Sequence, residues 1–437
     1  MDPMTLSVLV AVSIVFVLLF FGIPIGVTLG IAGIAGAVVF TGRLQSGLGI
    51  LLIQSISVTT TYGYIVIPMF ILMGTLAAEG GIARDLFDTA HHWAGRLPGG
   101  LSVSTVVTCA GMAAITGSSV ATAAAMTKLA LPELRRYKYR DSLSIGTITV
   151  GGTLAIMIPP SITFVIYSIF AEQSIGKLLI SGILPGLLTA ALYSIQVISR
   201  CVLDPTLGPK GPQFTWAERI RSLVGVLPFL GTLLVIWVGI MVGIWTPVEA
   251  SAGGVILVFI MGLARRRFQM GAVLSAFTDA VLGAASVMVV VIGALTFSTY
   301  LALSGVSEAV AEAIIGLGLS SFSLFVVFIL IYFILGMFME ATSIIALTVP
   351  LFMPVVKTMG WDPIWFGVIL VSMMEVAAVT PPVGLNLYAV KAAAPDVPTQ
   401  TIYTGSIPFW VCNLIAIFIL YKWPIIALYL PNKMLGG

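Results

Sequence analysis

The sequence predicts an all-α polytopic membrane protein made of inverted structural repeats, each with a re-entrant helical hairpin and a proline-broken transmembrane helix. The first observation behind this fold class is composition. Hydrophobic residues make up 59% of the 437 residues and charged residues only 8%, and the mean hydropathy is +1.13. Soluble domains carry about 25% charged residues, so this composition indicates a chain embedded in a lipid bilayer.

The second observation is an internal duplication, in which five landmarks recur at an offset of 222 to 225 residues. The landmarks are Pro24 with Pro247, Gly81 with Gly305, Gly111-Met112 with Gly336-Met337, Pro159-Pro160 with Pro381-Pro382, and Gly182 to Pro185 with Gly405 to Pro408. Because the offset is nearly constant, the landmarks indicate two repeats, residues 1–199 and 223–437, joined by a linker at 200–222. Broken helices at matching places in a duplicated membrane protein are typical of secondary transporters.

The third observation is an apolar segment of unusual length in each repeat. Residues 101–131 would form a straight helix of about 46 Å, against a hydrocarbon core of about 30 Å. Because Gly117-Ser118-Ser119 interrupts the segment near its centre, we expect two half-helices that enter and leave on the same side. Residues 322–355, broken at Glu340 to Ser343, are the matching hairpin. The alternative is a kinked spanning helix with a small-residue packing face.

The other apolar runs complete the predicted architecture. Spanning helices are expected at residues 4–21, 23–41, 63–79, 178–199, 223–244, 248–264, 285–303 and 403–427, and proline-broken spans at 142–170 and 364–390. Lateral or tilted helices are expected at 44–62 and 270–284, and interfacial helices at 80–99 and 305–319. If the linker is cytoplasmic and the repeats are inverted, fifteen of the twenty basic residues lie on the cytoplasmic side, as positively charged loops prefer.

The paired prolines free backbone carbonyls inside the membrane, because proline has no N–H to offer the carbonyl four residues back. Pro159 and Pro160 release the carbonyls of Ala155 and Ile156, and the second pair releases those of Ala377 and Ala378. A small hard cation beside the hairpin tips would satisfy these groups, whereas water or a Ser/Thr hydroxyl is the alternative partner. The predicted cation ligands are Ser118, Ala155, Ile156, Pro160, Thr342, Ser343, Ala377, Ala378, Thr380 and Pro382.

Hydroxyl, amide and backbone groups near the same breaks are the predicted substrate ligands. They are Ser119, Thr122, Thr153, Ser161, Gly384 and Asn386. The tip at Gly117-Ser118-Ser119 adds the N-terminus of a half-helix, which suits an anion. Glu340 and Glu375 are carboxylates within apolar runs and therefore functional candidates. Proton coupling and helix packing both remain open for these two.

Four motifs carry a resemblance to a known family. They are GMAAITGSSVATAAAM at residues 111–126, GGTLAIMIPPS at 151–161, MEATSII at 339–345 and VTPPVGLN at 379–386. Together they resemble the large membrane subunit of a tripartite ATP-independent periplasmic (TRAP) transporter, DctM-like, over essentially the whole chain. The resemblance implies Na⁺ coupling, an elevator motion, a small membrane subunit, a periplasmic solute-binding protein and a bacterial inner membrane. Ala155 departs from the glycine that family members often have there, but it keeps a small side chain.

The predicted function is therefore sodium-coupled secondary active import of small organic acids, such as C4-dicarboxylates or sugar acids. The alternative is a stand-alone sodium/dicarboxylate symporter that needs no binding protein. An enzyme is disfavoured because the only histidines, His91 and His92, are adjacent and interfacial, and no nucleophile–base motif is present. A channel does not require two broken hairpins, and nothing in the sequence favours a nucleic-acid partner.

The inverted topology can be tested by labelling. In a cysteine-free background, Lys138→Cys should resist an impermeant thiol reagent in intact cells, because the basic loop at 133–141 is predicted to be cytoplasmic. Lys357→Cys should react, because residues 356–363 are predicted to lie outside. The opposite labelling pattern would contradict the inverted arrangement.

Overall fold

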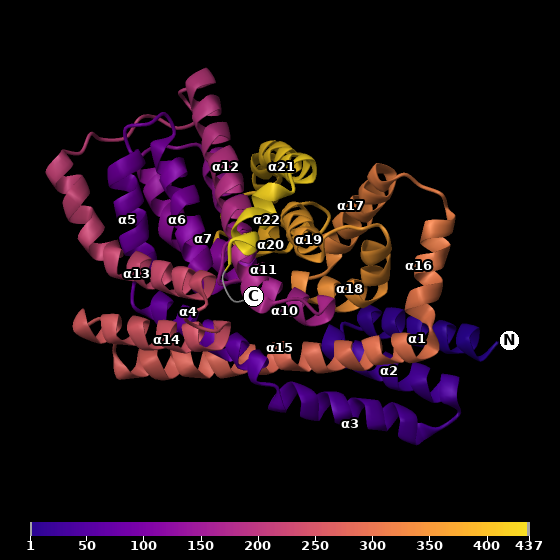
Figure 1. The fold of residues 1–437 in the computed structure, drawn as a ribbon. Coiled ribbons are helices and arrows are strands. Elements are labelled where there is room, and N and C mark those ends of the chain that lie inside the picture. The colour runs from indigo at the N-terminus through magenta and orange to yellow at the C-terminus, as the bar shows by residue number, and fades with distance from the viewer. Residues whose placement is uncertain (1, 435–437) are drawn as a thin grey trace.

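The computed structural model describes residues 2–434, and over this range it consists of helices and connecting loops without a strand (Figure 1). The first half contains α1 (Pro3–Phe20), α2 (Ile25–Thr41), α3 (Leu44–Thr60), η1 (Tyr62–Ile65), α4 (Val66–Glu79), α5 (Ile82–Ala94), α6 (Gly100–Thr116), α7 (Ser119–Arg136), α8 (Asp141–Gly151), α9 (Leu154–Met157), α10 (Ile162–Ala171), α11 (Ile175–Ser181) and α12 (Ile183–Leu203).

The second half repeats the order with fewer interruptions. It contains α13 (Trp216–Val242), α14 (Pro247–Ala264), α15 (Met270–Ser304), α16 (Val306–Gly316), α17 (Ser321–Phe338), α18 (Ala341–Thr358), α19 (Pro363–Ala378), α20 (Leu385–Ala393), α21 (Thr399–Lys422) and α22 (Ile425–Asn432). Within residues 2–434, nine helices are long and apolar enough to cross a membrane, or ten if the bent pair formed by α8–α9 and α10 is one span.

Both predicted hairpins are present. In the second, Thr348 donates a hydrogen bond to the hydroxyl of Tyr332 at 3.0 Å, and the rings of Phe328 and Phe352 lie 4.9 Å apart. Because both pairs are centred on residue 340, α17 and α18 run antiparallel. In the first hairpin, the hydroxyls of Thr116 and Thr122 meet at the tip, and the backbone N–H of Leu101 donates to the Tyr139 hydroxyl at 3.1 Å. The chain therefore returns to its starting level after each tip.

The helices that follow the proline breaks cross to the opposite half. The break at Pro159-Pro160 bends the first span by 43°, and α10 then packs against α18. The helix α20 packs against α7, and Asn386 donates from its side-chain amide to the Thr149 carbonyl at 3.1 Å. The two halves thus interlock around their broken elements.

An ion-pair cluster outside the apolar spans reinforces this interlock. Arg135, at the end of α7, lies 2.8 Å from Asp141 and 2.7 Å from Asp396. Asp141 begins α8, and Asp396 lies in the loop between α20 and α21. The hydrogen bond from the Arg135 guanidinium holds the pKa of Asp396 below its usual range. The first hairpin is therefore tied at its base to an element of the second half.

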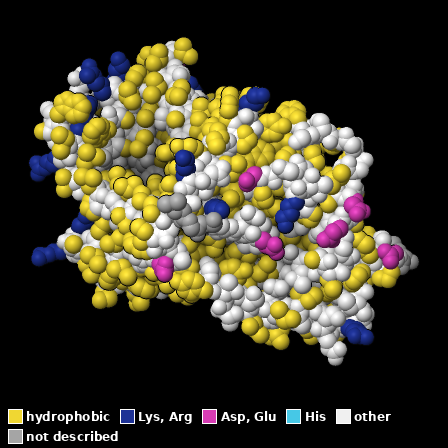
Figure 2. Space-filling view, viewed as in Figure 1, with side chains coloured by type: hydrophobic (Ala, Val, Ile, Leu, Met, Phe, Trp, Pro, Cys, Tyr) yellow, Lys and Arg dark blue, Asp and Glu magenta, His cyan; other side chains and the backbone are white. Residues whose placement is uncertain are grey.

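The remaining helices form a separate layer. Figure 1 shows α2, α3 and α15 running along one side of the molecule, and these three helices contact one another. The helix α4 packs against both α14 and α15, and α13 packs against α14. Figure 2 shows a surface made mostly of hydrophobic side chains, as expected beside lipid, with lysine and arginine more frequent toward the end that carries α5 and α13.

Two predicted boundaries are wrong. Residues 270–284 and 285–303 were expected to be separate helices, but α15 is one helix of 35 residues. In the first half, α3 ends at Thr60 and α4 begins at Val66, so that Pro68 lies in a first turn, where proline is best tolerated. No proline interrupts 270–304, so the chain continues. The linker is also shorter than 200–222, since a capping box between Thr215 and Glu218 begins α13 at Trp216.

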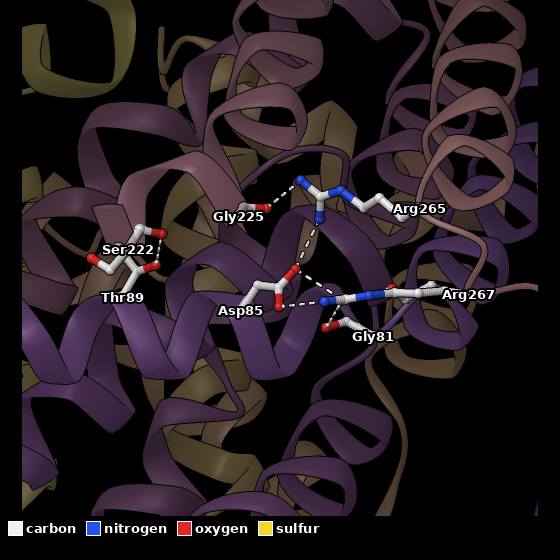
Figure 3. Close-up of polar contacts among 8 residues, drawn as sticks. Gly81, Asp85, Thr89, Ser222, Gly225, Arg265 and Arg267 are labelled. Carbon is white, nitrogen blue, oxygen red and sulfur yellow. Dashed lines mark hydrogen bonds and ion pairs between the residues drawn. The ribbon is translucent and has the colours of Figure 1, made fainter. Parts of the chain in front are cut away.

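The interfacial helix α5 is clamped to this layer by charge (Figure 3). Asp85 accepts hydrogen bonds from Arg265 at 2.8 Å and from Arg267 at 2.9 and 3.0 Å. Arg265 also donates to the Gly225 carbonyl at 2.6 Å, and the Thr89 hydroxyl donates to the Ser222 carbonyl at 2.9 Å. The side chain of Asp85 is only 14% exposed, so α5 is held firmly against α13 and the end of α14.

Neutralising Asp85 should weaken this clamp. Asp85→Asn leaves two guanidinium groups without their carboxylate, which costs about 1–3 kcal/mol and lowers the melting temperature of the purified protein by a few degrees. Asp279→Asn is the matched control, because Asp279 is exposed on α15 and forms no ion pair among residues 2–434. Equal melting temperatures for the two variants would show that the clamp contributes nothing.

Candidate functional site

A cavity of about 360 Å³ lies where the four broken elements meet. The first hairpin tip contributes Gly117 to Ala121, and the second contributes Met339 to Thr342. The proline breaks contribute Ile156 and Ala378, and α4 and α15 close the remaining wall. The cavity is thus lined by both halves and by the layer beside them.

In the first half, the hairpin tip is seated against the proline break. Gly117 has a left-handed backbone with φ of 57°, which glycine adopts without strain. A Cβ atom on Gly117 would lie 3.2 Å from the carbonyl oxygen of Pro160, so little room separates the tip from the break. Ser118 then begins α7 by accepting a hydrogen bond from the Ala121 N–H at 3.4 Å.

In the second half, the hairpin likewise packs against the proline break, through different atoms. The Gly384 N–H donates to the Met337 carbonyl at 3.2 Å, which joins the end of α17 to the loop after Pro382. Gly336 lies so close to the side chain of Ala377 that no Cβ atom fits between them. Each hairpin therefore lies beside the proline break of its own half.

The released carbonyls have different partners. The Ser161 hydroxyl donates to the Ile156 carbonyl at 2.6 Å, and the Thr380 N–H donates to the Ala377 carbonyl at 3.1 Å. These two carbonyls therefore have partners of the kind expected at a proline kink. Within residues 2–434, the carbonyls of Ala155 and Ala378 accept no hydrogen bond, because a proline stands four residues after each.

Five of the predicted ligands line the cavity: Ser118, Ser119, Ile156, Thr342 and Ala378. Thr122, Thr153, Ser161, Asn386, Ala155, Pro160, Ser343, Ala377, Thr380, Pro382 and Gly384 do not. Among these, Thr380 donates to the Val376 carbonyl at 2.7 Å, and Thr153 donates to the Val150 carbonyl at 2.8 Å. Their roles as ligands stay predictions.

The cavity wall also contains residues that the sequence reasoning missed. Thr75 of α4 lines it and donates to the Ala276 carbonyl at 3.0 Å, and Ser286 of α15 lines it one turn beyond Gly283. Thr116 of α6 and Thr163 of α10 add two more hydroxyls. The available signal was a polar or glycine residue within an otherwise apolar run, such as 281–295.

The electrostatics of the cavity are set by backbone and hydroxyl groups. Its described lining contains no lysine, arginine or histidine, and Glu340 is its one charged side chain. Thr342 donates to the Glu340 carboxylate at 2.6 Å, at the N-terminus of α18 where the helix dipole favours negative charge. The N-terminus of α7 also faces the cavity. Such a lining offers N–H and hydroxyl donors to an anion, and carbonyl, hydroxyl and carboxylate oxygens to a cation.

The fold and this site define a multi-pass helical membrane protein whose duplicated, interrupted helices enclose one central cavity. Comparison with known families gives a closer assignment. The family described as tripartite ATP-independent periplasmic transporter, DctM component, matches residues 12–425, so the chain belongs to this family.

Several relatives match nearly the whole chain. A C4-dicarboxylate TRAP transporter large permease protein, DctM, of Pseudomonas aeruginosa is 32% identical over 93% of this chain and 94% of its own length. The ectoine TRAP transporter large permease TeaC of Halomonas elongata is 28% identical over 95% of this chain and 96% of its own length. The sialic acid TRAP transporter large permease SiaM of Vibrio cholerae is 26% identical over 96% of this chain and 97% of its own length.

Among solved structures, the YdaH transporter of Alcanivorax borkumensis has the same kind of fold. It matches with a TM-score of 0.64 over 86% of this chain and 89% of that chain. The sequence identity is 15%, so this likeness concerns the fold alone.

Proposed function

We propose that this chain is the membrane subunit that carries out sodium-coupled import of small organic acids across a bacterial inner membrane. It would work with a small membrane subunit and a periplasmic solute-binding protein, as membership of the TRAP family suggests. The observation that carries the proposal is the convergence of both hairpin tips and both proline breaks on one cavity. Relatives named for C4-dicarboxylate, ectoine and sialic acid support a carboxylate-containing substrate.

Sodium coupling would follow from the charges of the cavity. The substrate carboxylate would bind at the N-terminus of α7, near the hydroxyl of Ser119. No cationic side chain in the described lining offsets that charge, and Glu340 adds a second negative charge. Na⁺ bound at the free carbonyls of Ala155 and Ala378 would supply the compensation. Substrate would then bind well only together with the cation, which is the condition for coupled transport.

An elevator motion would follow from how the helices divide. We define the unit as α6–α12 with α17–α21, and the frame as α1–α4 with α13–α15. The unit is joined across the halves by α10 with α18, α20 with α7, and α21 with α8. The cavity lies at the boundary, because Thr75 and Ser286 belong to the frame. A sliding unit would keep its own contacts with the substrate and exchange only the frame wall.

The membrane potential would assist the motion, because moving one net charge across the membrane yields about 2.3 kcal/mol per 100 mV.

The proposal is tested by uptake into vesicles that hold the chain and its small subunit, with the binding protein outside. Uptake that needs both a sodium gradient and the binding protein supports it. Uptake by the chain alone would instead favour a stand-alone symporter.

Removing the tip hydroxyl should weaken cation binding. Ser118→Ala should raise the sodium concentration for half-maximal uptake about tenfold, the effect of losing about 1.4 kcal/mol. Ser174→Ala is the matched control, because Ser174 likewise begins a helix by accepting a hydrogen bond, from the Lys177 N–H, but lies outside the cavity. If Ser118→Ala and Ser174→Ala keep the same sodium dependence, the tip hydroxyl is not a cation ligand.

Cross-linking should distinguish the elevator from local gating. Gly176 of the unit lies against Ile240 of the frame, where a Cβ on Gly176 would be 3.3 Å from the Ile240 side chain. An oxidised Gly176→Cys/Ile240→Cys variant should lose uptake, and reduction should restore it. The control is Gly151→Cys, which can pair with Cys109 inside the unit, where the two Cβ atoms would lie 3.1 Å apart. Normal uptake by the fully cross-linked frame-to-unit variant would rule out the elevator.

A further inference from the structure

The cavity wall formed by α15 continues in one direction as an exposed face. Gly283 and Ser286 line the cavity, and Asp279 lies one turn before Gly283 on the same face of the helix. Asp279 is exposed, whereas Ala294 and Phe297, which continue this face in the other direction, are at most 4% exposed. The cavity therefore opens toward the N-terminal end of α15.

The first hairpin supplies a second wall of this opening. Ala121 lines the cavity near the tip, and Ala125 and Lys128 follow one and two turns later on the same face of α7. These three side chains are exposed, while Thr122 and Met126, on another face of α7, are buried. The exposed face of α7 thus runs from the cavity toward the base of the hairpin.

Both walls end on the same side of the molecule, because α5 contacts both ends. His91 of α5 packs on Tyr137 at the base of the hairpin, with ring centroids 5.4 Å apart. Asp85 of α5 accepts hydrogen bonds from Arg265 and Arg267, which lie just before α15. This is the side that the basic residues predict to be cytoplasmic. We call the opening between the exposed faces of α7 and α15 the mouth.

The two walls of the mouth carry opposite charges. Lys128 is the first charged residue of α7 after the tip, and Asp279 is the one charged residue of α15. Within residues 2–434 neither forms an ion pair. Along its helix, Lys128 lies about 10 Å beyond Ala121, and Asp279 lies about 6 Å beyond Gly283. Lys128 is therefore nearer the predicted cytoplasmic side than Asp279, by roughly one helical turn.

We propose that Lys128 and Asp279 form an ion pair that closes the mouth when the unit slides outward. The unit carries Lys128 and the frame carries Asp279, so a shift of about one turn away from the cytoplasm brings the two charges level. The pair would stabilise the outward-facing arrangement and break when the unit moves inward, where the mouth must open to release substrate. This inference rests on the elevator motion of the proposed function.

The test compares the accessibility of the cavity from the two sides of the membrane in the complete reconstituted transporter. In a cysteine-free background, Ala121→Cys reports the opening by its rates of reaction with an impermeant thiol reagent added on either side. Lys128→Gln and Asp279→Asn should each raise the ratio of cytoplasmic to external labelling about threefold, as expected for the loss of one partly exposed ion pair. The reversed pair, Lys128→Asp/Asp279→Lys, should restore the wild-type ratio.

Glu79→Gln is the matched control. Glu79 is exposed, lies one turn after Thr75 on the cavity-lining face of α4, and forms no ion pair among the described residues. Because Thr75 bonds to the Ala276 carbonyl, Glu79 lies nearer the cytoplasmic end of the mouth than Asp279. Outward sliding moves Lys128 away from Glu79, so this variant should keep the wild-type labelling ratio.

The other outcomes contradict the inference. Unchanged ratios in both single variants would show that the pair does not form, and an equal shift in Glu79→Gln would show a general effect of charge. A reversed pair that behaves like the single variants would show that the two charges act separately. If these variants do not fold, Lys128→Cys/Asp279→Cys should cross-link on oxidation faster than Lys128→Cys/Glu79→Cys, and the opposite order would contradict the pairing. Labelling needs no sodium gradient, so a failure of sodium-driven uptake alone would overturn the proposed coupling and not the pair.

Discussion

Backbone groups inside a bilayer must find partners, because no water is available there to hydrogen-bond them. This chain interrupts four helices around one cavity, at two hairpin tips and two proline breaks. The interruptions are tolerated because they face one another: Gly117 is seated against Pro160, and Gly336 against Ala377. The rest of the architecture follows from keeping these four points together.

The crossing of the halves is one consequence. After each break, α10 and α20 leave their own repeat and pack on the hairpin of the other. A single repeat would leave its break uncovered, so neither half can enclose the cavity alone. The small residues at the contacts serve the same end, since a larger side chain would separate tip from break and expose polar backbone to lipid.

The charge of the cavity is a second consequence. Backbone N–H groups, carbonyls and hydroxyls dominate its wall, and Glu340 is the one charged side chain in the described lining. Under the proposed function, such a wall would discriminate weakly among carboxylates, in keeping with the variety of substrates named for its relatives. Under the proposed function it would also make anion binding depend on bound cations, and this dependence would itself couple the two fluxes.

Much of this fold could be predicted from the sequence, because segment length, proline placement and the repeat are local signals. The hairpin at 101–131 and the break at Pro159-Pro160 are examples. The continuity of α15 was missed, since it depends on the absence of a break that the first half possesses between α3 and α4. Which polar residues face the cavity could not be predicted either, because Thr75 and Ser286 reach it only through packing between distant helices.

The most direct test of the account is a pair of structures of the complete transporter with substrate, one in sodium and one in a bulky organic cation. The account predicts density for a small cation beside the free carbonyls of Ala155 and Ala378 in sodium only, with substrate in the cavity between the two tips. Cation density elsewhere, or substrate bound outside this cavity in the presence of sodium, would contradict it.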